Sequence, residues 1–217
     1  MKLDDNLNCS RYDWAASIIN TAQDTKANVF DIGARDGVMK HLIHNKNILY
    51  EGFDLEPLAT SITRWNLEEE NKSLENKADY ILFLEIVEHL RNPWSCLSNL
   101  NKVMKVGGKL ILTTPNPHWS NARFTFFTNN FLQCFSQSDL DLNHHIFTPW
   151  PHVVEKLLTD NGFLIETYVT LERKTKIFDK KVFENPLRIF KRIIMVLLES
   201  VSKNSCGMSY GIVAKKI

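Results

Sequence analysis

Carboxylate and imidazole side chains gather immediately after a mainly apolar segment near the middle of this sequence. Residues 79–84 predict a strand that is buried on both faces, and Glu85, Glu88 and His89 follow it directly. If the chain becomes helical after Leu84, these three side chains share one helix face through their i, i+3 and i+4 spacing. Hard carboxylate oxygens and one imidazole suit a divalent ion such as Mg²⁺, Mn²⁺ or Fe²⁺ better than a structural zinc.

Three further histidines are candidates for a metal ligand or a general base. His144 or His145, in the segment NHHIFTPW, could supply a fourth metal ligand. Without a metal, His89 or His145 becomes the candidate general base, because imidazole titrates near neutral pH. His118 is an additional candidate, on the loop after the next predicted strand. The alternative is that the Glu-His group only shapes a pocket or caps the strand end.

The element that positions these groups is a strand, helix and strand unit. A helix is expected from Asn92 to Met104, with Asn92 as its cap and Pro93 in its first turn. Gly107 and Gly108 are expected to end that helix before a strand over 109–114. Such a unit joins parallel strands, and ligands bind beyond the carboxyl ends of strands in these sheets. The polar residues expected at this edge are Glu85, Glu88, His89, Asn116 and His118.

A second candidate site lies at a glycine turn in the first part of the chain. Residues 28–32 predict a buried strand, residues 33–37 read Gly-Ala-Arg-Asp-Gly, and a helical pattern begins at Val38. The turn lacks the third glycine of the dinucleotide fingerprint. A carboxylate at Asp36 would also repel a pyrophosphate at the helix start. A ligand without phosphate is therefore favoured over a dinucleotide, and a purely structural turn is the alternative.

Acidic and amide side chains end the next two predicted strands. Asp54 closes a strand over 48–54 and follows Asp31 by 54 − 31 = 23 positions, near the spacing at which an acid meets ribose hydroxyls. A carboxylate can accept both hydroxyl protons of a ribose, although a solvated acid at a strand end is the alternative. A short strand over 62–65 ends at Asn66, whose amide could pair with the edge of a base.

Taken together, five motifs closely resemble class I S-adenosylmethionine-dependent methyltransferases over roughly residues 28–170. The resemblance implies an α/β Rossmann-like fold: a seven-stranded, mostly parallel sheet with helices on both faces and a reversed last strand. It also implies S-adenosylmethionine as cofactor. The motifs are DIGARDG at 31–37, GFDLEP at 52–57, RWNLEE at 64–69, ADYILFLEIVEHL at 78–90 and KVGGKLILTTPN at 105–116.

The resemblance also assigns cofactor roles to individual residues. Asp31 and Gly33 would face the methionine part, Asp54 the ribose, and Glu85 the region near the sulfonium. Many relatives carry glycine where Arg35 stands and aspartate where Asn66 stands. An acid-lined pocket suits the cationic cofactor, which already carries an activated methyl group. The implied cofactor-binding residues are Asp31, Gly33, Ala34, Arg35, Gly37, Asp54, Leu55, Asn66, Leu67 and Glu85.

The Glu-x-x-Glu-His motif resembles two metal-using subgroups, the small-RNA 2′-hydroxyl methyltransferases and the ubiquinone-pathway O-methyltransferases. In those enzymes the ion binds paired oxygens of the substrate and lowers the proton affinity of the attacking hydroxyl. The resemblance therefore implies a divalent cation, Mg²⁺ or Mn²⁺. Its expected ligands are Glu85, Glu88, His89 and His145.

Two segments of the second half are expected to serve the acceptor. Residues 117–147 predict a long connection that covers the substrate, in which Phe124, Phe126, Phe127 and Phe131 either line an acceptor pocket or pack on the core. A helix after Thr148-Pro149 and a strand over 163–171 follow. Residues 185–203 predict an amphipathic helical insertion, with Arg188, Lys191 and Arg192 beside an apolar face of Leu187, Phe190, Ile194, Leu197, Leu198 and Val201.

Three roles are open for the amphipathic segment 185–203. It could cover the sheet or the acceptor pocket, form a homodimer, or contact a membrane surface or a lipid-linked substrate. The longest strongly apolar run, 193–198, is far too short to span a bilayer.

Bulk properties predict one domain over residues 1–217. The 26 basic and 25 acidic residues give a net charge of +1, which offers no general attraction to nucleic acid. Four widely spaced cysteines and the absence of an apolar signal core predict reduced thiols in a cytoplasmic protein.

These observations favour a methyltransferase for a small-molecule or glycan-intermediate acceptor, with a hydroxyl as the methylated group. One alternative is a metal-dependent 2′-O-methyltransferase of an RNA terminus. The other is a catalytically inactive nucleoside-binding partner subunit.

Overall fold

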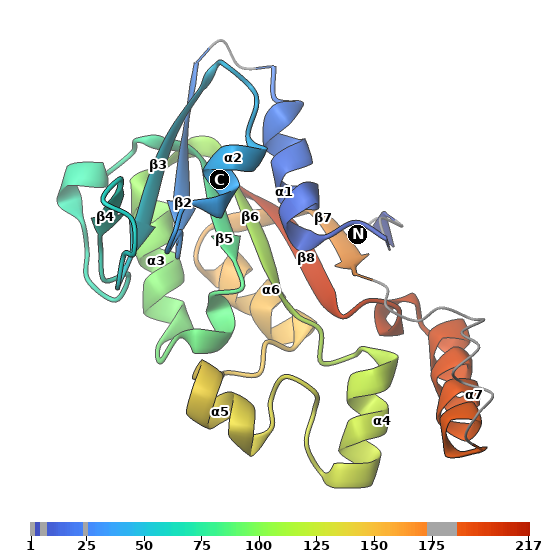
Figure 1. Ribbon diagram of the computed structural model, residues 1–217. Helices are drawn as coiled ribbons and strands as arrows, with labels where there is room; N and C mark the ends of the chain where they lie inside the picture. The colour runs from blue at the N-terminus through green and yellow to red at the C-terminus, as the bar shows by residue number, and fades with distance from the viewer. Residues whose placement is uncertain (1–2, 5–7, 24–25, 173–185) are drawn as a thin grey trace.

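The computed structural model of the protein describes residues 3–4, 8–23, 26–172 and 186–217. Its centre is a sheet with the strand order β1-β7-β8-β6-β5-β2-β3-β4 (Figure 1). Only β8 runs antiparallel to its neighbours, β6 and β7. The strands are β1 (Leu3–Asp4), β2 (Ala27–Ile32), β3 (Ile48–Asp54), β4 (Ile62–Arg64), β5 (Ala78–Leu84), β6 (Met104–Pro115), β7 (Phe163–Leu171) and β8 (Ser209–Lys216).

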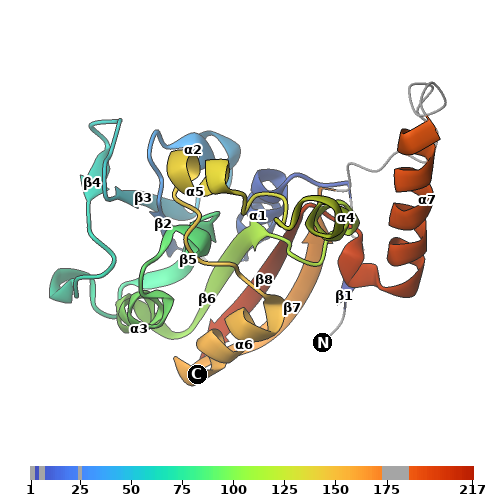
Figure 2. The same cartoon turned by 90° about the horizontal axis from the view of Figure 1, so that it is seen from below.

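The predicted α/β fold is confirmed. The seven expected strands are β2 to β8, the last of them is reversed, and the two-residue strand β1 extends the sheet beside β7. Figure 2 shows α1 and α2 on one face of the sheet and α3 and α6 on the other. The helices are α1 (Arg11–Asn20), α2 (Val38–Leu42), α3 (Pro93–Val103), α4 (Ser120–Asn129), α5 (Gln137–Asn143), α6 (Pro151–Asp160) and α7 (Pro186–Val201). Short 3₁₀ helices are η1 (Lys72–Leu74), η2 (Val87–His89) and η4 (Lys203–Ser205).

The central strands are buried because helices cover both of their faces. One core cluster joins β5 and β6 to Leu97 and Leu100 of α3 and Leu158 of α6. The other packs Trp14 and Ile19 of α1 against the opposite side chains of the same strands. This two-sided burial is the reason why the central strands are apolar in runs instead of alternating. It holds the carboxyl ends of β2, β5 and β6 at one edge.

The two consecutive glycines lie within β6 and do not end α3, which corrects the prediction. Helix α3 ends at Val103, and β6 begins at the next residue. Gly107 has φ 82°, and a Cβ on Gly108 would lie 2.9–3.2 Å from backbone oxygens. The pairing of β5 with β6 shifts register between Ala78 and Tyr80. The glycines therefore allow an irregularity inside a strand, where the backbones approach closely.

The segment 117–147 contains two helices, α4 and α5, where a long connection was predicted. Both lie beyond the carboxyl ends of the central strands (Figure 1). The core packing considered for the four phenylalanines does not occur. Phe126, Phe127 and Phe131 are exposed, and Phe124 is half-buried.

Helix α7 confirms the predicted helix in the segment 185–203, of which residue 185 lies outside the described residues. It packs beside α4, and Ser120 Oγ of α4 donates a hydrogen bond of 2.8 Å to the buried carboxylate of Glu199. The side chain of Leu187 also lies outside the described part. In that part of the chain, no helix has the length and apolarity needed to cross a membrane.

Candidate active site

A cleft of about 420 Å³ opens at the carboxyl ends of β2, β3 and β5. Acidic side chains of the three strand ends and of the turn after β2 share it. This is the edge at which ligands bind in such sheets. The residues that line it are Tyr12, Asp31, Gly33, Ala34, Arg35, Asp36, Val38, Met39, Asp54, Leu84, Glu85, Ile86 and His89.

The floor of the cleft is the turn from β2 to α2. Gly33 has φ 80°, and a Cβ at this position would lie 2.1 Å from Cδ1 of Ile86. The amides of Gly33 and Ala34 both donate to the carbonyl of Phe53, at 2.8 and 3.0 Å. Glycine is therefore required both by the backbone conformation and by the close approach of Ile86. The turn is fixed to the end of β3.

Asp31 is a buried acid at the centre of the cleft. It accepts a hydrogen bond of 2.5 Å from the hydroxyl of Tyr50. Burial raises the pKa of Asp31 to about 6, although the Tyr50 hydrogen bond opposes the shift, and the charges of Asp54 and Asp36 add to it. A cation in the cleft would favour the ionised carboxylate and so reverse this shift.

Asp54 is held in place by two backbone amides. Its Oδ2 accepts from the amide of Arg35 and its Oδ1 from the amide of Glu56, both at 2.8 Å. A carboxylate oxygen has two lone pairs, so each oxygen keeps one for a ligand in the cleft. The arrangement suits a vicinal diol such as a ribose.

Glu85 adopts a left-handed backbone conformation, with φ 57°, directly after β5. Its amide donates to the carbonyl of Thr113 at 2.9 Å, and its carboxylate lies 3.4 Å from Nη1 of Arg11. Burial raises the pKa of Glu85 to about 7, and the positive charge of Arg11 opposes this. Oε1 of Glu85 is buried and has no hydrogen-bond partner among the described residues.

The predicted single helix face for the Glu-Glu-His group is wrong. The left-handed conformation at Glu85 prevents a continuous helix from Glu85 to His89. Only a single 3₁₀ turn, η2, forms, and it spans Val87–His89. Glu85 therefore lines the cleft, whereas Glu88 is buried against β6. Glu85 is not part of the metal-type cluster described next, although the sequence predicted it as a ligand.

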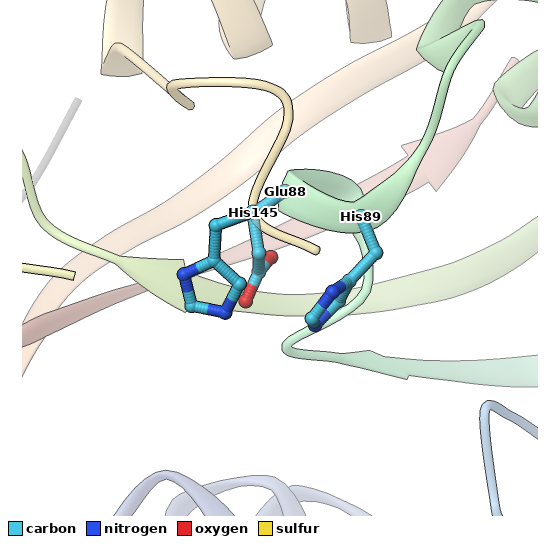
Figure 3. A group of neighbouring side chains, drawn as sticks. All are labelled: Glu88, His89 and His145. Carbon is cyan, nitrogen blue, oxygen red and sulfur yellow. The ribbon is translucent and has the colours of Figure 1, made fainter. Parts of the chain in front are cut away.

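Glu88, His89 and His145 form a compact cluster in the described part of the chain (Figure 3). One potential ligand atom from each lies within 4.8 Å of the other two. Oε2 of Glu88 accepts from Thr114 Oγ1 at 2.9 Å, and its buried Oε1 has no partner among the described residues. Nδ1 of His145 lies 2.6 Å from the carbonyl of Cys134. If Nδ1 donates this bond, Nε2 is left with a free lone pair, as in many metal sites.

The backbone of Glu88 fixes the segment that carries His145. The carbonyl of Glu88 accepts from the amides of both Ile146 and Phe147 at 3.0 Å. The rings of His89 and His145 lie edge to face, with centroids 4.8 Å apart. The segment after α5 is thus tied to η2, and two residues distant in sequence meet.

Burial determines the protonation of this cluster. It raises the pKa of the Glu88 carboxyl well above its usual value, and the nearby Glu85 adds to the shift. It lowers the pKa of His89, as does the neighbouring His145. Burial therefore favours the uncharged form of both side chains.

The other predicted residues lie outside both groups. Gly37 caps α2, and Leu55 is exposed. Asn66 donates to the side chain of Glu69 at 3.0 Å, and the carbonyl of the buried Leu67 accepts from Asn99 at 2.9 Å. These residues do not line the cleft.

Two predicted histidines also lie apart from the cluster. The ring of His118 contacts that of Trp150, with centroids 5.3 Å apart. His144 is the exposed left-handed cap of α5, so His145 is the member of the pair that joins the cluster.

Four residues of the cleft region were not predicted from the sequence. Tyr12 and Ile86 line the cleft, Tyr50 holds Asp31, and Arg11 lies between Glu85 and Glu172. Arg11 and Tyr12 belong to α1, which precedes every recognisable motif. Their contribution arises from the docking of α1 on the sheet.

A family model described as a methyltransferase domain matches residues 9–168, well over half of the chain. The chain belongs to this methyltransferase family. As the family implies, the protein is an enzyme that uses S-adenosylmethionine. The cleft fits this cofactor, because carboxylates dominate its polar lining and the cofactor carries a cationic sulfonium and an ammonium group.

Solved structures show the same fold for this methyltransferase. A S-adenosylmethionine-dependent methyltransferase from Archaeoglobus fulgidus is 18% identical, with a TM-score of 0.60 and 95% of each chain covered. A putative methyltransferase from Bacillus halodurans is 15% identical, with a TM-score of 0.61, covering 94% of this chain and 98% of the other. Phosphoethanolamine N-methyltransferase 2 of Haemonchus contortus, in complex with S-adenosylmethionine, is 16% identical, with a TM-score of 0.57. The match covers 94% of this chain and 52% of the other. No curated protein matches the chain in sequence.

Proposed function

We propose that this methyltransferase transfers the methyl group of S-adenosylmethionine to a hydroxyl oxygen of a small molecule or glycan intermediate. The observation that carries the proposal is the position of the Glu88–His89–His145 cluster. His89 belongs both to this cluster and to the lining of the cofactor cleft. A hydroxyl must lose its proton as it attacks the methyl group, and a base or a metal beside the cofactor serves that purpose.

The cofactor end of the reaction depends on charge and alignment. Asp31 would bind the ammonium group, Asp54 the ribose hydroxyls, and Glu85 would lie near the sulfonium. The methyl group is already activated, so the enzyme's main task is to hold donor and acceptor in line. The turn at Gly33 and the carboxylate of Asp54 are themselves held by backbone hydrogen bonds, so they would hold the bound cofactor in a defined position.

We also propose that Glu88, His89 and His145 bind a divalent cation. The buried, unpartnered Oε1 of Glu88 and the carbonyl bond at Nδ1 of His145 both suit a ligand set. Two imidazoles shift the preference from Mg²⁺ towards Mn²⁺, because Mg²⁺ prefers oxygen ligands. Such an ion would lower the proton affinity of the attacking hydroxyl. Without an ion, His89 or His145 would act as the general base that accepts the proton, with His118 as a more distant candidate.

The test is methyl transfer to an acceptor panel after dialysis against a chelator. We expect activity to fall by at least about tenfold and to return with Mn²⁺ more fully than with Mg²⁺. Glu88→Gln should show the same loss without rescue, while Glu69→Gln, outside the cleft, should behave as the wild type. Full activity after chelation, with no Mn²⁺ in the protein by metal analysis, would exclude the ion and leave the histidines as bases.

The same panel distinguishes the alternatives. An RNA-terminal 2′-hydroxyl as the only acceptor would identify the RNA methyltransferase, which the net charge of +1 does not favour. Binding of S-adenosylmethionine by calorimetry without turnover of any acceptor would identify an inactive partner subunit. Homodimer formation or membrane-surface contact through 185–203 and the cytoplasmic location stay predictions.

A further inference from the structure

A second and larger cavity, of about 850 Å³, lies between α4 and α7. Aromatic and aliphatic side chains form most of its wall. This volume falls within the range of small-molecule sites, which are typically apolar with a few polar groups. The apolar residues that define it are Phe124, Phe126, Phe127, Trp150, Ile194 and Leu198.

The polar lining of this α4–α7 cavity has the opposite charge to the cofactor cleft. Arg123 is its charged residue, and no carboxylate is among the described residues that line it. Lys191 adds a second cation at the wall, with Nζ 5.2 Å from the ring centre of Phe124. Asp31, Asp36, Asp54 and Glu85, by contrast, line the cofactor cleft. A cationic ligand suits the cleft, and an anionic ligand suits the cavity.

The cavity begins next to the catalytic edge of the sheet. Helix α4 starts shortly after β6 ends and leads away from the sheet (Figure 1). His118 precedes the helix, Arg123 lies in its first turn and Phe127 lies in its last turn. Strand β6 pairs with β5, which leads into Glu85 and the cluster. A ligand's polar end could therefore lie towards the cofactor while its apolar end follows α4.

The cavity is distinct from the exposed apolar side chains of α7. Ile194 and Leu198, four positions apart, face the cavity and are half-buried. Ile193, Leu197 and Val201 are exposed. The helix therefore has apolar side chains on two sides, and the side with Ile194 and Leu198 faces the cavity.

We propose that the α4–α7 cavity binds the aliphatic chain of an amphipathic acceptor whose polar end carries an anionic group, a phosphate or a carboxylate. The role as acceptor site rests on the proposed methyl transfer, whereas binding of the chain does not. The cavity supplies an apolar surface for the chain, and Arg123 supplies the charge that orients the anionic end towards the cofactor.

The test is calorimetric titration with n-alkyl phosphates and n-alkanoates of six to twelve carbons, kept below micelle formation. Burial of one methylene strengthens binding up to about fourfold, so affinity should rise with chain length until the cavity is filled. The series that binds more tightly identifies the anionic group. Affinity that does not depend on chain length in either series would overturn the proposal.

Matched variants locate the binding. Leu198→Gln should lower the affinity for the longest ligand about tenfold or more. Leu197→Gln, at the exposed neighbouring position, should leave the affinity unchanged. Equal losses in both variants, or none in Leu198→Gln, would place the ligand elsewhere and refute the cavity site. Arg123→Gln should reduce the preference for n-octyl phosphate over uncharged n-octyl glucoside, although Lys191 remains, and Arg64→Gln on β4 should leave it unchanged.

The binding measurement separates this inference from the proposed function. Chain-length-dependent binding to a protein without methyltransferase activity would support the cavity site and contradict only the proposed reaction. Binding of S-adenosylmethionine with no binding of any alkyl ligand would contradict only the cavity site.

Discussion

Asp31 is the residue whose environment is most closely adapted to a cationic ligand. It is buried, its hydrogen bond to Tyr50 only partly offsets desolvation, and two other acids lie close enough to raise its pKa further. A carboxylate in this situation destabilises the empty protein and stabilises the complex. Residue-scale experiments at Asp31 should therefore separate stability from binding.

Binding of S-adenosylmethionine should weaken as the pH falls, with protonation of Glu85 contributing below its pKa of about 7 and that of Asp31 below its pKa of about 6. The cationic cofactor requires the ionised carboxylates, so each of them should raise the dissociation constant by up to about tenfold for each pH unit below its pKa. Calorimetry between pH 5 and pH 8 measures this. Asp31→Asn should bind weakly with a smaller pH dependence, and an unchanged pH dependence in this variant would refute the assignment.

Without cofactor, Asp31→Asn should be more stable than the wild type above pH 6. The folded pKa of Asp31, about 6, exceeds the ordinary value of 3.8, so the folded state binds the proton more tightly. Its ionisation therefore costs stability as the pH rises from 3.8 to 6, by up to about 3 kcal/mol in full. Between pH 5 and pH 7.5, urea unfolding should show the advantage of the variant grow by about 1 kcal/mol. A constant difference would contradict the raised pKa.

At the scale of elements, the β2–α2 turn and η2 are coupled by a steric contact that no motif reveals. Gly33 lies in the turn, and Ile86 is the residue directly before η2. The side chain of Ile86 occupies the space that a Cβ at position 33 would need. The turn recognised as a cofactor motif is also the packing partner of the segment that carries the candidate metal ligands.

Gly33→Ala should be more damaging than Gly37→Ala. Both glycines have φ 80°, so both substitutions introduce similar backbone strain, of about 1–2 kcal/mol. A Cβ at Gly33 would also lie 2.1 Å from Ile86, whereas at Gly37 the nearest atom is 3.6 Å away. Gly33→Ala should therefore lose cofactor affinity as well as stability. Equal effects on urea unfolding and on cofactor binding would show that strain alone matters.

At the scale of the whole molecule, the site is assembled from segments far apart in the chain. The family fold supplies the acid-lined cleft, and α4, α5 and α7 lie beyond the carboxyl-terminal edge of the sheet (Figure 1). Glu199 of α7 is buried and accepts a hydrogen bond from Ser120 at the start of α4. This contact joins α7 to the start of α4, which follows β6 in the chain.

Ser120→Ala should destabilise the protein by about 1–3 kcal/mol. The substitution removes a hydrogen bond to the buried carboxylate of Glu199. A buried carboxylate that loses a hydrogen-bond donor raises the free energy of the folded state. Ser200→Ala is the matched control, because that exposed hydroxyl bonds only to Leu197 of its own helix and its loss should change stability by less than about 0.5 kcal/mol. Urea unfolding measures both, and a wild-type stability for Ser120→Ala would show that the contact does not anchor α7.

The sequence by itself determined the sheet, the family and the acids of the cleft, because buried parallel strands need apolar runs and the cofactor turn needs glycine and carboxylates at fixed spacing. Asp31, Gly33, Asp54 and Glu85 all line the cleft as predicted. Only the tertiary structure decided the partners of Glu88 and the composition of the second cavity. The left-handed backbone at Glu85 separates it from Glu88, and His145 reaches the cluster through hydrogen bonds to a distant carbonyl. Such contacts depend on how separate helices dock, and local sequence periodicity does not encode that docking.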